Sequence, residues 1–250
     1  MSGHSKWSTI KRKKGAIDAL RGRVFTKLIK EITVAARHGG GDPDMNPRLR
    51  TALLTARGQN LPADNIKKAI QRGTGELPGQ NYDEIQYEGY GPGGVAIIMQ
   101  TLTDNRNRTV GELRHILTKS GGNMGENGSV GWIFSKKGTF EIDATAASED
   151  TVFEVALDAG AEDVKTEDGI VFVQCSPHDF EAVKAALESK KIPIGASEVA
   201  MIPSTSIKLE GKEAEQMLKL MEALEDHEDV QNVYANFDID ASIMEQFSGA

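Results

Sequence analysis

Apolar residues recur every three or four positions over residues 17–35, which is the spacing of one buried face of an α-helix. They are Ile17, Leu20, Val24, Leu28, Ile32 and Ala35. Four cations follow the same helical spacing on a stripe about 125° from the apolar face, and these are Arg23, Lys27, Lys30 and Arg37. Glycines and a proline at residues 39–43 end the helix. The pattern predicts a helix that packs on one side and presents positive charge on another.

Two shorter helices are predicted after this one. Asn46 is a good cap and Pro47 suits a first helical position. The second helix then turns Leu49, Leu53 and Ala56 inward, with Arg48, Arg50 and Arg57 elsewhere. The third begins at Pro62, ends at Gly73 and buries Ile66, Ala69 and Ile70. Because three such helices can bury their apolar faces against one another, residues 1–80 are expected to form a helical bundle preceded by an arm.

The hydrophobic period changes after a linker at residues 74–80. Alternation around Ile85 and Tyr87, a glycine-rich turn at residues 89–94 and an apolar run at 95–102 predict a β-hairpin. The glycines join strand to strand, so a hairpin is favoured over a phosphate-binding loop. A helix is expected to follow, capped by Thr109 and Glu112, and then a short strand at residues 130–134.

The composition turns acidic from Lys136 onward, and the predicted elements run strand, helix, strand, strand, helix, strand. This βαββαβ order is typical of a ferredoxin-like layer. After Pro203 the chain adds only a strand near residues 207–209, a helix and a strand, which cannot close a core alone. We therefore predict an α+β protein with three parts: a basic three-helix domain (residues 1–80), a split ferredoxin-like domain (81–134 and 205–250) and an inserted acidic ferredoxin-like domain (135–204).

The net charge of −8 conceals a strong asymmetry. Residues 1–80 hold 16 Lys and Arg against 6 Asp and Glu, whereas residues 136–250 hold 9 against 25. Residues 3–14 place five cations around Trp7 with no acid. Only Asp18 and Glu31 are available in the sequence to pair with the cations of residues 6–37, so most are expected to stay unneutralised. This favours phosphate contact over a merely solvated face, and the acidic end would be repelled.

The residues expected to contact nucleic acid combine the arm, the first two helices and two later arginines. Trp7 is expected to stack on a base or to anchor the arm. Arg106 and Arg108 precede a helix start, where an anion site and a role in fixing the loop are about equally favoured. The full set is Lys6, Trp7, Lys11, Arg12, Lys13, Lys14, Arg23, Lys27, Lys30, Arg48, Arg50, Arg106 and Arg108.

The sequence argues against an enzyme. Its five histidines are scattered, and it has no Cys-x-x-Cys, no His-Glu-x-x-His and no Gly-x-Ser-x-Gly motif. We expect no catalytic residue, no metal, no cofactor and no small-molecule substrate. A single cysteine, Cys175, is typical of a protein in a reducing cytoplasm. We expect Cys175 to be a small buried apolar residue. No apolar run approaches the roughly 18 to 20 residues of a membrane span, so a cytoplasmic protein without a membrane partner is expected.

Several motifs make the chain resemble the YebC/PmpR family, which includes the mitochondrial translational activator of cytochrome oxidase subunit I. The resemblance spans nearly the whole chain. Ser8-Thr9 and Leu20 are minor departures from the family pattern. The motifs are Gly-His-Ser-Lys-Trp at 3–7, Phe-Thr-Lys-Leu-Ile-Lys-Glu-Ile at 25–32, Gly-Gly-Gly-Asp-Pro at 39–43, Asn-Pro-Arg-Leu-Arg at 46–50, Gly-Tyr-Gly-Pro-Gly-Gly at 89–94 and Thr-Asp-Asn-Arg-Asn-Arg-Thr at 103–109.

The resemblance implies a three-domain protein that controls gene expression without catalysis. Members are commonly classed as DNA-binding transcriptional regulators, and others look like ribosome-associated translation factors that assist at proline runs. We predict a DNA-binding regulator, with ribosome or RNA association as the alternative. The residues themselves do not choose between DNA and RNA, because lysines and arginines contact phosphate without reading sequence and no helix-turn-helix spacing stands out. The oligomeric state and the role of the acidic domain also stay open.

Overall fold

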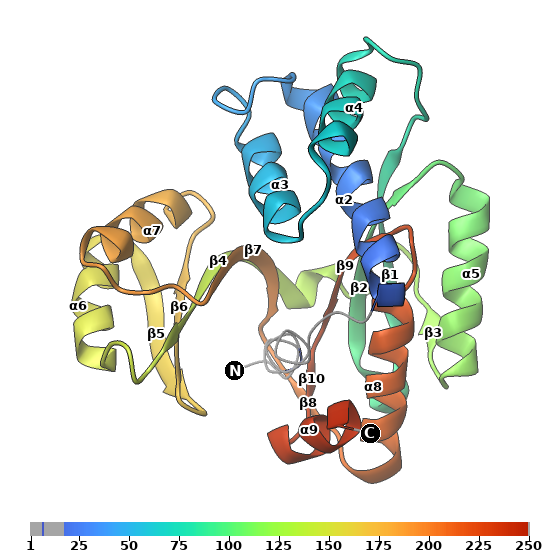
Figure 1. The fold of residues 1–250 in the computed structure, drawn as a ribbon. Helices are drawn as coiled ribbons and strands as arrows, with labels where there is room; N and C mark the ends of the chain where they lie inside the picture. Colours follow the sequence, from blue (N-terminus) through green and yellow to red (C-terminus); the bar gives the residue numbers. More distant parts are fainter. Residues whose placement is uncertain (1–6, 8–17, 250) are drawn as a thin grey trace. The chain divides into compact units, whose positions relative to one another are not determined.

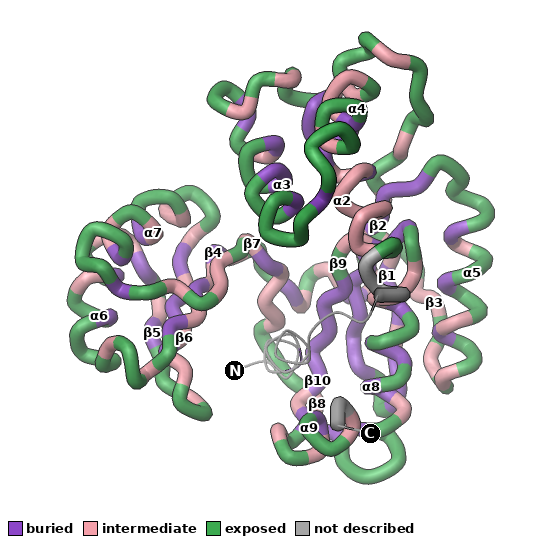
Figure 2. Tube along the Cα trace, viewed as in Figure 1, coloured by how far each residue is buried: buried purple, intermediate pink, exposed green. Residues whose placement is uncertain are grey.

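The computed structural model describes residue 7 and residues 18–249 (Figure 1). The chain divides into two compact units. We call residues 132–206 the inserted unit, and the described residues within 3–131 and 207–250 the main unit. Each unit has buried apolar residues of its own, which Figure 2 shows in purple along the helices and strands. Among the described helices, none combines the length and the apolar character needed to cross a bilayer.

The main unit begins with the three-helix bundle that the sequence predicts. Both shorter helices pack on the first, around Ile32, Leu49 and Ala69. The side chain of Asn46 accepts the N–H of Leu49 at 3.1 Å and donates to the carbonyl of Ala35 at 2.8 Å. It therefore caps one helix while tying it to another. The helices are α2 (Asp18–Gly39), α3 (Pro47–Gly58) and α4 (Ala63–Thr74).

The main unit also contains a four-stranded antiparallel sheet in the order β3-β1-β2-β9. Two helices pack on it around Met99, Leu117 and Met217. The β1–β2 pairing confirms the hairpin expected at the glycine-rich turn. At that turn Gly93 has a φ of 69°, a conformation that glycine adopts without strain. The elements are β1 (Asp83–Tyr90), β2 (Ala96–Thr103), α5 (Arg106–Lys119), β3 (Asn123–Met124), α8 (Gly211–Glu225) and β9 (Val230–Ala235).

The prediction of a strand at residues 130–134 is wrong. Gly131–Ile133 forms a 3₁₀ turn, and Phe134 already begins the first strand of the inserted unit. The cause is Glu88, whose carboxylate accepts the N–H of Val130 at 2.7 Å and of Gly131 at 2.9 Å. These N–H groups are satisfied by a side chain and do not enter a strand ladder.

The strand expected near residues 207–209 exists, but it does not join the four-stranded sheet. It is β8 (Ile207–Lys208), which pairs in parallel with β10 (Phe237–Asp238) outside the four-stranded sheet. In a ferredoxin-like sheet the third strand lies between the first and the second. Here β1 has that position, between β2 and β3, so the sheet has the ferredoxin-like arrangement although β1 comes first along the chain. A helix that the hydrophobic pattern did not predict, α9 (Ala241–Gly249), follows.

The inserted unit has the βαββαβ order that the sequence predicts, with a four-stranded antiparallel sheet ordered β5-β6-β4-β7. Its core includes Phe140, Val171 and Leu187, and Cys175 is fully buried there. The α+β class is therefore confirmed. The elements are β4 (Phe134–Asp143), α6 (Glu149–Asp158), β5 (Ala161–Glu167), β6 (Ile170–Cys175), α7 (Phe180–Ser189) and β7 (Ala196–Pro203).

Candidate nucleic-acid interface

The cationic stripe of α2 lies against an acidic turn of the same unit, residues 225–229. Arg23 Nη1 lies 2.7 Å from Oδ2 of Asp226, and Lys27 Nζ donates to the carbonyl oxygen of Glu225. Lys30 Nζ donates to the carbonyl oxygen of Glu228 at 3.2 Å and to Asp229 Oδ1 at 2.6 Å. The stripe is therefore not the open positive surface that the sequence predicts.

The expectation that only Asp18 and Glu31 can neutralise these cations is wrong as well. The two acceptors of Lys30 lie 198 and 199 positions away along the chain. Arg37, the last member of the stripe, donates to the carbonyl oxygen of Gln80 at 3.1 Å. Tertiary packing supplies acids and carbonyl groups that neighbours in sequence do not.

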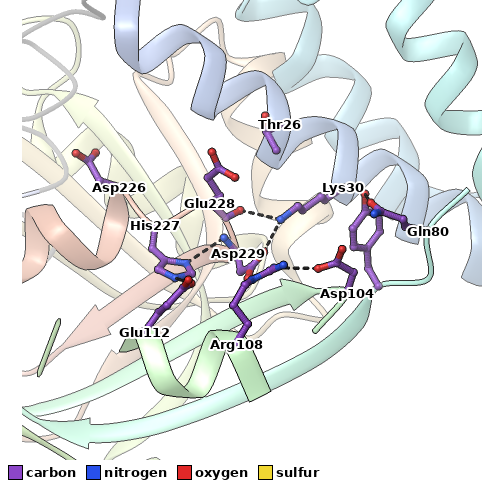
Figure 3. Close-up of a pocket in the computed structure, with 11 residues that line it drawn as sticks. Thr26, Lys30, Gln80, Asp104, Arg108, Glu112, Asp226, His227, Glu228 and Asp229 are labelled. Atoms are coloured by element: carbon purple, nitrogen blue, oxygen red, sulfur yellow. Dashed lines mark hydrogen bonds and ion pairs between the residues drawn. The ribbon is translucent and has the colours of Figure 1, made fainter. Parts of the chain in front are cut away.

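Asp229 is the centre of this arrangement (Figure 3). Its side chain is 2% exposed and accepts from Lys30 Nζ at 2.6 Å, Thr109 Oγ1 at 2.6 Å and Arg108 Nη2 at 2.8 Å. Burial by itself raises the pKa of Asp229, but these three donors outweigh it and hold that pKa well below its usual range. The ionised carboxylate thus links α2, α5 and the start of β9.

The other arginines of the candidate set are also paired, with one exception. Arg48 makes a two-pronged contact with Glu31, at 2.7 and 3.0 Å, and reaches Glu84 at 2.9 Å, so its pKa is raised. Arg106 Nε lies 2.8 Å from Asp83, and Arg108 also reaches Asp104 at 2.9 Å. Both arginines lie in the first turn of α5, whose cap is Asn105, so the expectation that they precede a helix capped by Thr109 and Glu112 is wrong. Their ion pairs favour a role in fixing this part of the fold over an anion site. The exception is Arg50, which is exposed and forms no ion pair with a described residue.

Trp7 is 2% exposed and belongs to the apolar core of the main unit. Its Nε1 donates to Glu225 Oε1 at 3.0 Å, and its ring lies 6.0 Å from that of Phe247, centroid to centroid. A buried ring cannot stack on a base, so of the two expected roles the structure favours anchoring. The arm cations Lys6, Lys11, Arg12, Lys13 and Lys14 lie outside the described residues.

Exposed positive charge gathers instead on α3 and α4. Five cations there are exposed, and none forms an ion pair with any residue that the structure describes: Arg50, Arg57, Lys67, Lys68 and Arg72. Asp64 is the one acid within these two helices. Four residues (59–62) connect the helices, and Asn60 has a φ of 57°. The sequence-based set included Arg50 but missed Arg57, Lys67, Lys68 and Arg72. The excess of these four cations over the single acid of residues 57–72 was a signal that could have found them.

Two large apolar side chains in this part of the chain are exposed. Met45 is 79% exposed and Leu54 is 58% exposed. Leu54 stands four residues after Arg50 and three before Arg57, so the three share one face of α3. This face therefore combines positive charge with exposed apolar surface.

An open cavity of about 590 Å³ lies beside Asp229 in the main unit (Figure 3). Two cations, Lys30 and Arg108, line it together with five carboxylates: Asp104, Glu112, Asp226, Glu228 and Asp229. The lining is net negative and would repel phosphate. The cavity is therefore a poor candidate for the nucleic-acid interface.

Three groups in this cavity have the chemistry of metal ligands. Glu112, His227 and Asp229 bring one such atom each within 4.8 Å of one another. However, His227 Nδ1 accepts the N–H of Asp229 at 3.1 Å, which places the ring proton on Nε2, 2.9 Å from Glu112. Asp229 is bound by its three donors. These atoms are already engaged, so the residues fit a hydrogen-bond network and not a metal centre.

Comparison with known families accounts for almost the whole chain. Residues 5–76 match the model described as the TACO1/YebC protein N-terminal domain, and residues 82–237 match the TACO1/YebC second and third domain. The chain belongs to the TACO1/YebC family. The motif-based resemblance is therefore confirmed.

Relatives in this family match the chain from end to end. A probable transcriptional regulatory protein of Trichlorobacter lovleyi is 59% identical over 246 residues, which is 98% of this chain and 99% of the relative. Its counterpart in Geobacter sulfurreducens is 58% identical over the same shares. The crystal structure of a conserved hypothetical protein from Aquifex aeolicus is similar, with a TM-score of 0.80 and 44% identity, over 90% of this chain and 93% of that one. TACO1/YebC relatives thus share both sequence and fold with this chain.

Proposed function

We propose that this protein is a non-enzymatic regulator of gene expression that binds duplex DNA. Members of the family are described as probable transcriptional regulatory proteins, which supports the regulatory role. In this role the protein needs no catalytic residue, no metal and no cofactor, and it acts in the cytoplasm.

The observation that carries the proposal is the exposed charge of α3 and α4. Arg50, Arg57, Lys67, Lys68 and Arg72 are exposed, with Asp64 as the one acid within the two helices. Cations exposed on a rigid helical scaffold release condensed counterions when they meet phosphate, which is the main source of affinity for DNA. The stripe of α2 and the arginines at 48, 106 and 108 hold the fold together in this account.

The connection between the two helices supports a duplex target. A short turn between two helices is the arrangement of helix-turn-helix proteins, in which the second helix enters the major groove. On α4, Asn65, Lys68 and Arg72 are exposed and follow one helical face. Asn and Arg are the side chains that most often reach base edges there. We assign α4 to the groove and α3 to the flanking phosphates.

The proposal is tested by fluorescence anisotropy on a labelled DNA duplex over a range of salt concentrations. Replacing Lys67, Lys68 and Arg72 by alanine should weaken binding and lower the slope of log K against log salt by about 0.9 for each phosphate that the variant no longer neutralises. A control variant replaces Lys136, Lys184 and Lys190 of the inserted unit by alanine and removes the same charge. Equal affinity of both variants and the native protein would overturn the proposal.

The same assay separates DNA from RNA. Unlabelled duplex DNA should displace the labelled duplex at lower concentration than a single-stranded RNA of equal length. If RNA displaces it more effectively, the alternative of ribosome or RNA association replaces the DNA assignment. Crosslinking in cells, followed by sequencing of both polymers, gives the matching result in vivo: promoter fragments for the first and ribosomal RNA for the second.

The arm remains a separate part of the proposal. Replacing Lys11, Arg12, Lys13 and Lys14 by alanine should weaken binding and flatten its salt dependence by about 0.7 to 0.9 for each phosphate that the arm no longer neutralises. If the arm variant keeps native affinity and slope while the α4 variant shows a decrease in both, DNA binding rests on the helices alone.

A further inference from the structure

Helix α6 of the inserted unit turns two large apolar side chains toward solvent. Phe153 is 45% exposed and Leu157 is 49% exposed. They are four residues apart and therefore neighbours on one helical face. The helix is not short of core contacts, because Val152 and Ala156 are fully buried in the unit's apolar cluster. The exposed pair is a second apolar face, distinct from the one that packs.

Acidic residues surround this pair. Glu149, Asp150, Glu154 and Asp158 all belong to α6 and are all exposed, and the helix contains no Lys or Arg. None of the four forms an ion pair with a residue in the described part of the chain. Residues 132–206 as a whole hold 14 Asp and Glu against 6 Lys and no Arg. The apolar pair therefore sits in a field of uncompensated negative charge.

This charge decides which occupants the face can accept. Nucleic acid and anionic membrane surfaces carry negative charge and would be repelled. A second copy of the chain, packed face to face, would bring eight carboxylates together across the contact. A cationic protein segment is attracted, and burying Phe153 and Leu157 against its own apolar side chains adds favourable free energy.

We propose that this face of α6 docks a basic amphipathic helix of a partner protein. Apolar anchors of that helix pack against Phe153 and Leu157, and its lysines or arginines lie over the four carboxylates. Because the site lies in the inserted unit and has the opposite charge, it does not depend on the DNA-binding face of α3 and α4. The acidic unit thus recruits a basic partner while the helical domain contacts nucleic acid.

The test uses the full chain labelled with ¹⁵N and a synthetic Leu/Lys peptide patterned as an amphipathic helix. In NMR titrations, the amide shifts should concentrate on α6. A scrambled peptide of the same composition, whose leucines do not share one face, should bind about tenfold more weakly or worse. Shifts spread over the whole acidic surface, or equal binding of both peptides, would overturn the proposal, since charge alone would then explain binding.

Three variants separate the apolar pair from net charge. The double variant Phe153→Ser and Leu157→Ser should weaken peptide binding by about tenfold or more. Glu154→Lys should weaken it strongly, whereas Glu188→Lys, at an exposed position of α7 in the same unit, changes the net charge equally and should have little effect. All these positions are exposed, so the ¹H–¹⁵N spectrum of each variant should show a native fold. Equal weakening by Glu154→Lys and Glu188→Lys would contradict a site on α6.

Discussion

The ammonium of Lys30 lies 2.6 Å from Oδ1 of Asp229, and both side chains are more than nine-tenths buried. Lys30 belongs to α2 in the helical bundle, and Asp229 directly precedes β9 of the sheet. This one ion pair therefore ties the bundle to the sheet within the main unit. Arg108 and Thr109 bind the other carboxylate oxygen, so the pair is part of a satisfied network and not an isolated buried charge.

Replacing Asp229 by asparagine should strongly destabilise the main unit. The amide removes the negative charge and leaves Lys30 without its buried partner, which typically costs about 3 to 5 kcal/mol of unfolding free energy. Urea titration followed by the fluorescence of Trp7, in a chain whose Trp132 is replaced by phenylalanine, reports on this unit. A matched control is Asp226→Asn, whose partner Arg23 is 43% exposed, and it should cost less than about 1 kcal/mol.

The effect of Asp229→Asn should depend on pH with a definite sign. The pKa of Asp229 is lowered in the folded protein, so its carboxylate contributes stability above the unfolded pKa of about 3.9. That contribution disappears as the pH falls toward the folded pKa. The unfolding free energy of the native protein should therefore exceed that of the variant most at neutral pH, and the difference should narrow below about pH 4. A gap that is constant between pH 7 and pH 3 would show that the carboxylate's charge is not what stabilises the unit.

Much of the fold follows from local sequence signals. The periodicity of Ile32 and its neighbours, the cap at Asn46 and the glycine-rich turn at residues 89–94 each predict an element that the structure contains. The strand predicted at residues 130–134 does not form, because the N–H groups of Val130 and Gly131 donate to Glu88, 42 and 43 positions earlier. Hydrophobic pattern does not reveal a side chain that competes for backbone groups at such a distance.

The site was harder to predict than the fold, for the same reason. Spacing correctly places Arg23, Lys27 and Lys30 on one stripe, but their partners are at the other end of the sequence. A count of nearby acids cannot identify such partners. The cations of α4, by contrast, stay exposed, although they are spaced along one side of their helix much as the cations of α2 are. Exposure, rather than cation density, separates the two groups, and exposure is a tertiary property.

The two tryptophans should differ sharply in their access to a quencher. Trp7 is 2% exposed, whereas Trp132 is 78% exposed. Iodide should quench the fluorescence of a Trp7→Phe chain, which retains Trp132, several-fold more strongly than that of a Trp132→Phe chain. The result tests the anchoring role of Trp7, because an accessible ring at position 7 would restore base stacking as its function. Unfolding both variants in urea should make their quenching equal and serves as the control.

Cys175 should be inert in the native protein. The side chain is fully buried, and burial, followed by the charges of Asp179 and Glu162, raises the pKa of its thiol to about 11. Since the thiolate is the reactive form, a thiol reagent at pH 8 should modify it only after unfolding. A matched control is Ala185→Cys on the exposed side of α7, which should react at once. Native Cys175 reacting as fast as Cys introduced there would contradict the burial.

Glu88 should control the order of the loop that leads into the inserted unit. Glu88 is 3% exposed. Its carboxylate accepts three backbone N–H groups, from Gly128 at 3.1 Å, Val130 at 2.7 Å and Gly131 at 2.9 Å. Burial alone would raise the pKa of Glu88, but these donors together lower it. The carboxylate therefore contributes its full stability above the unfolded pKa of about 4.3, and this contribution is lost as the pH falls toward the lower pKa of the folded protein.

Replacing Glu88 by glutamine turns an NH₂ group toward donors that need an acceptor. An unsatisfied buried group costs about 1 to 3 kcal/mol, so amide hydrogen exchange at Val130 and Gly131 should accelerate by about tenfold or more. The control is Gln86→Ala on the same strand, whose contact with Glu88 is 3.5 Å long and should matter little. Exchange in Glu88→Gln that is no faster than in the control would show that backbone packing, and not the carboxylate, holds this loop. Exchange that accelerates at these two amides but not along β1 and β2 identifies Glu88 as the local anchor, because the β1–β2 hairpin has its own ladder of hydrogen bonds.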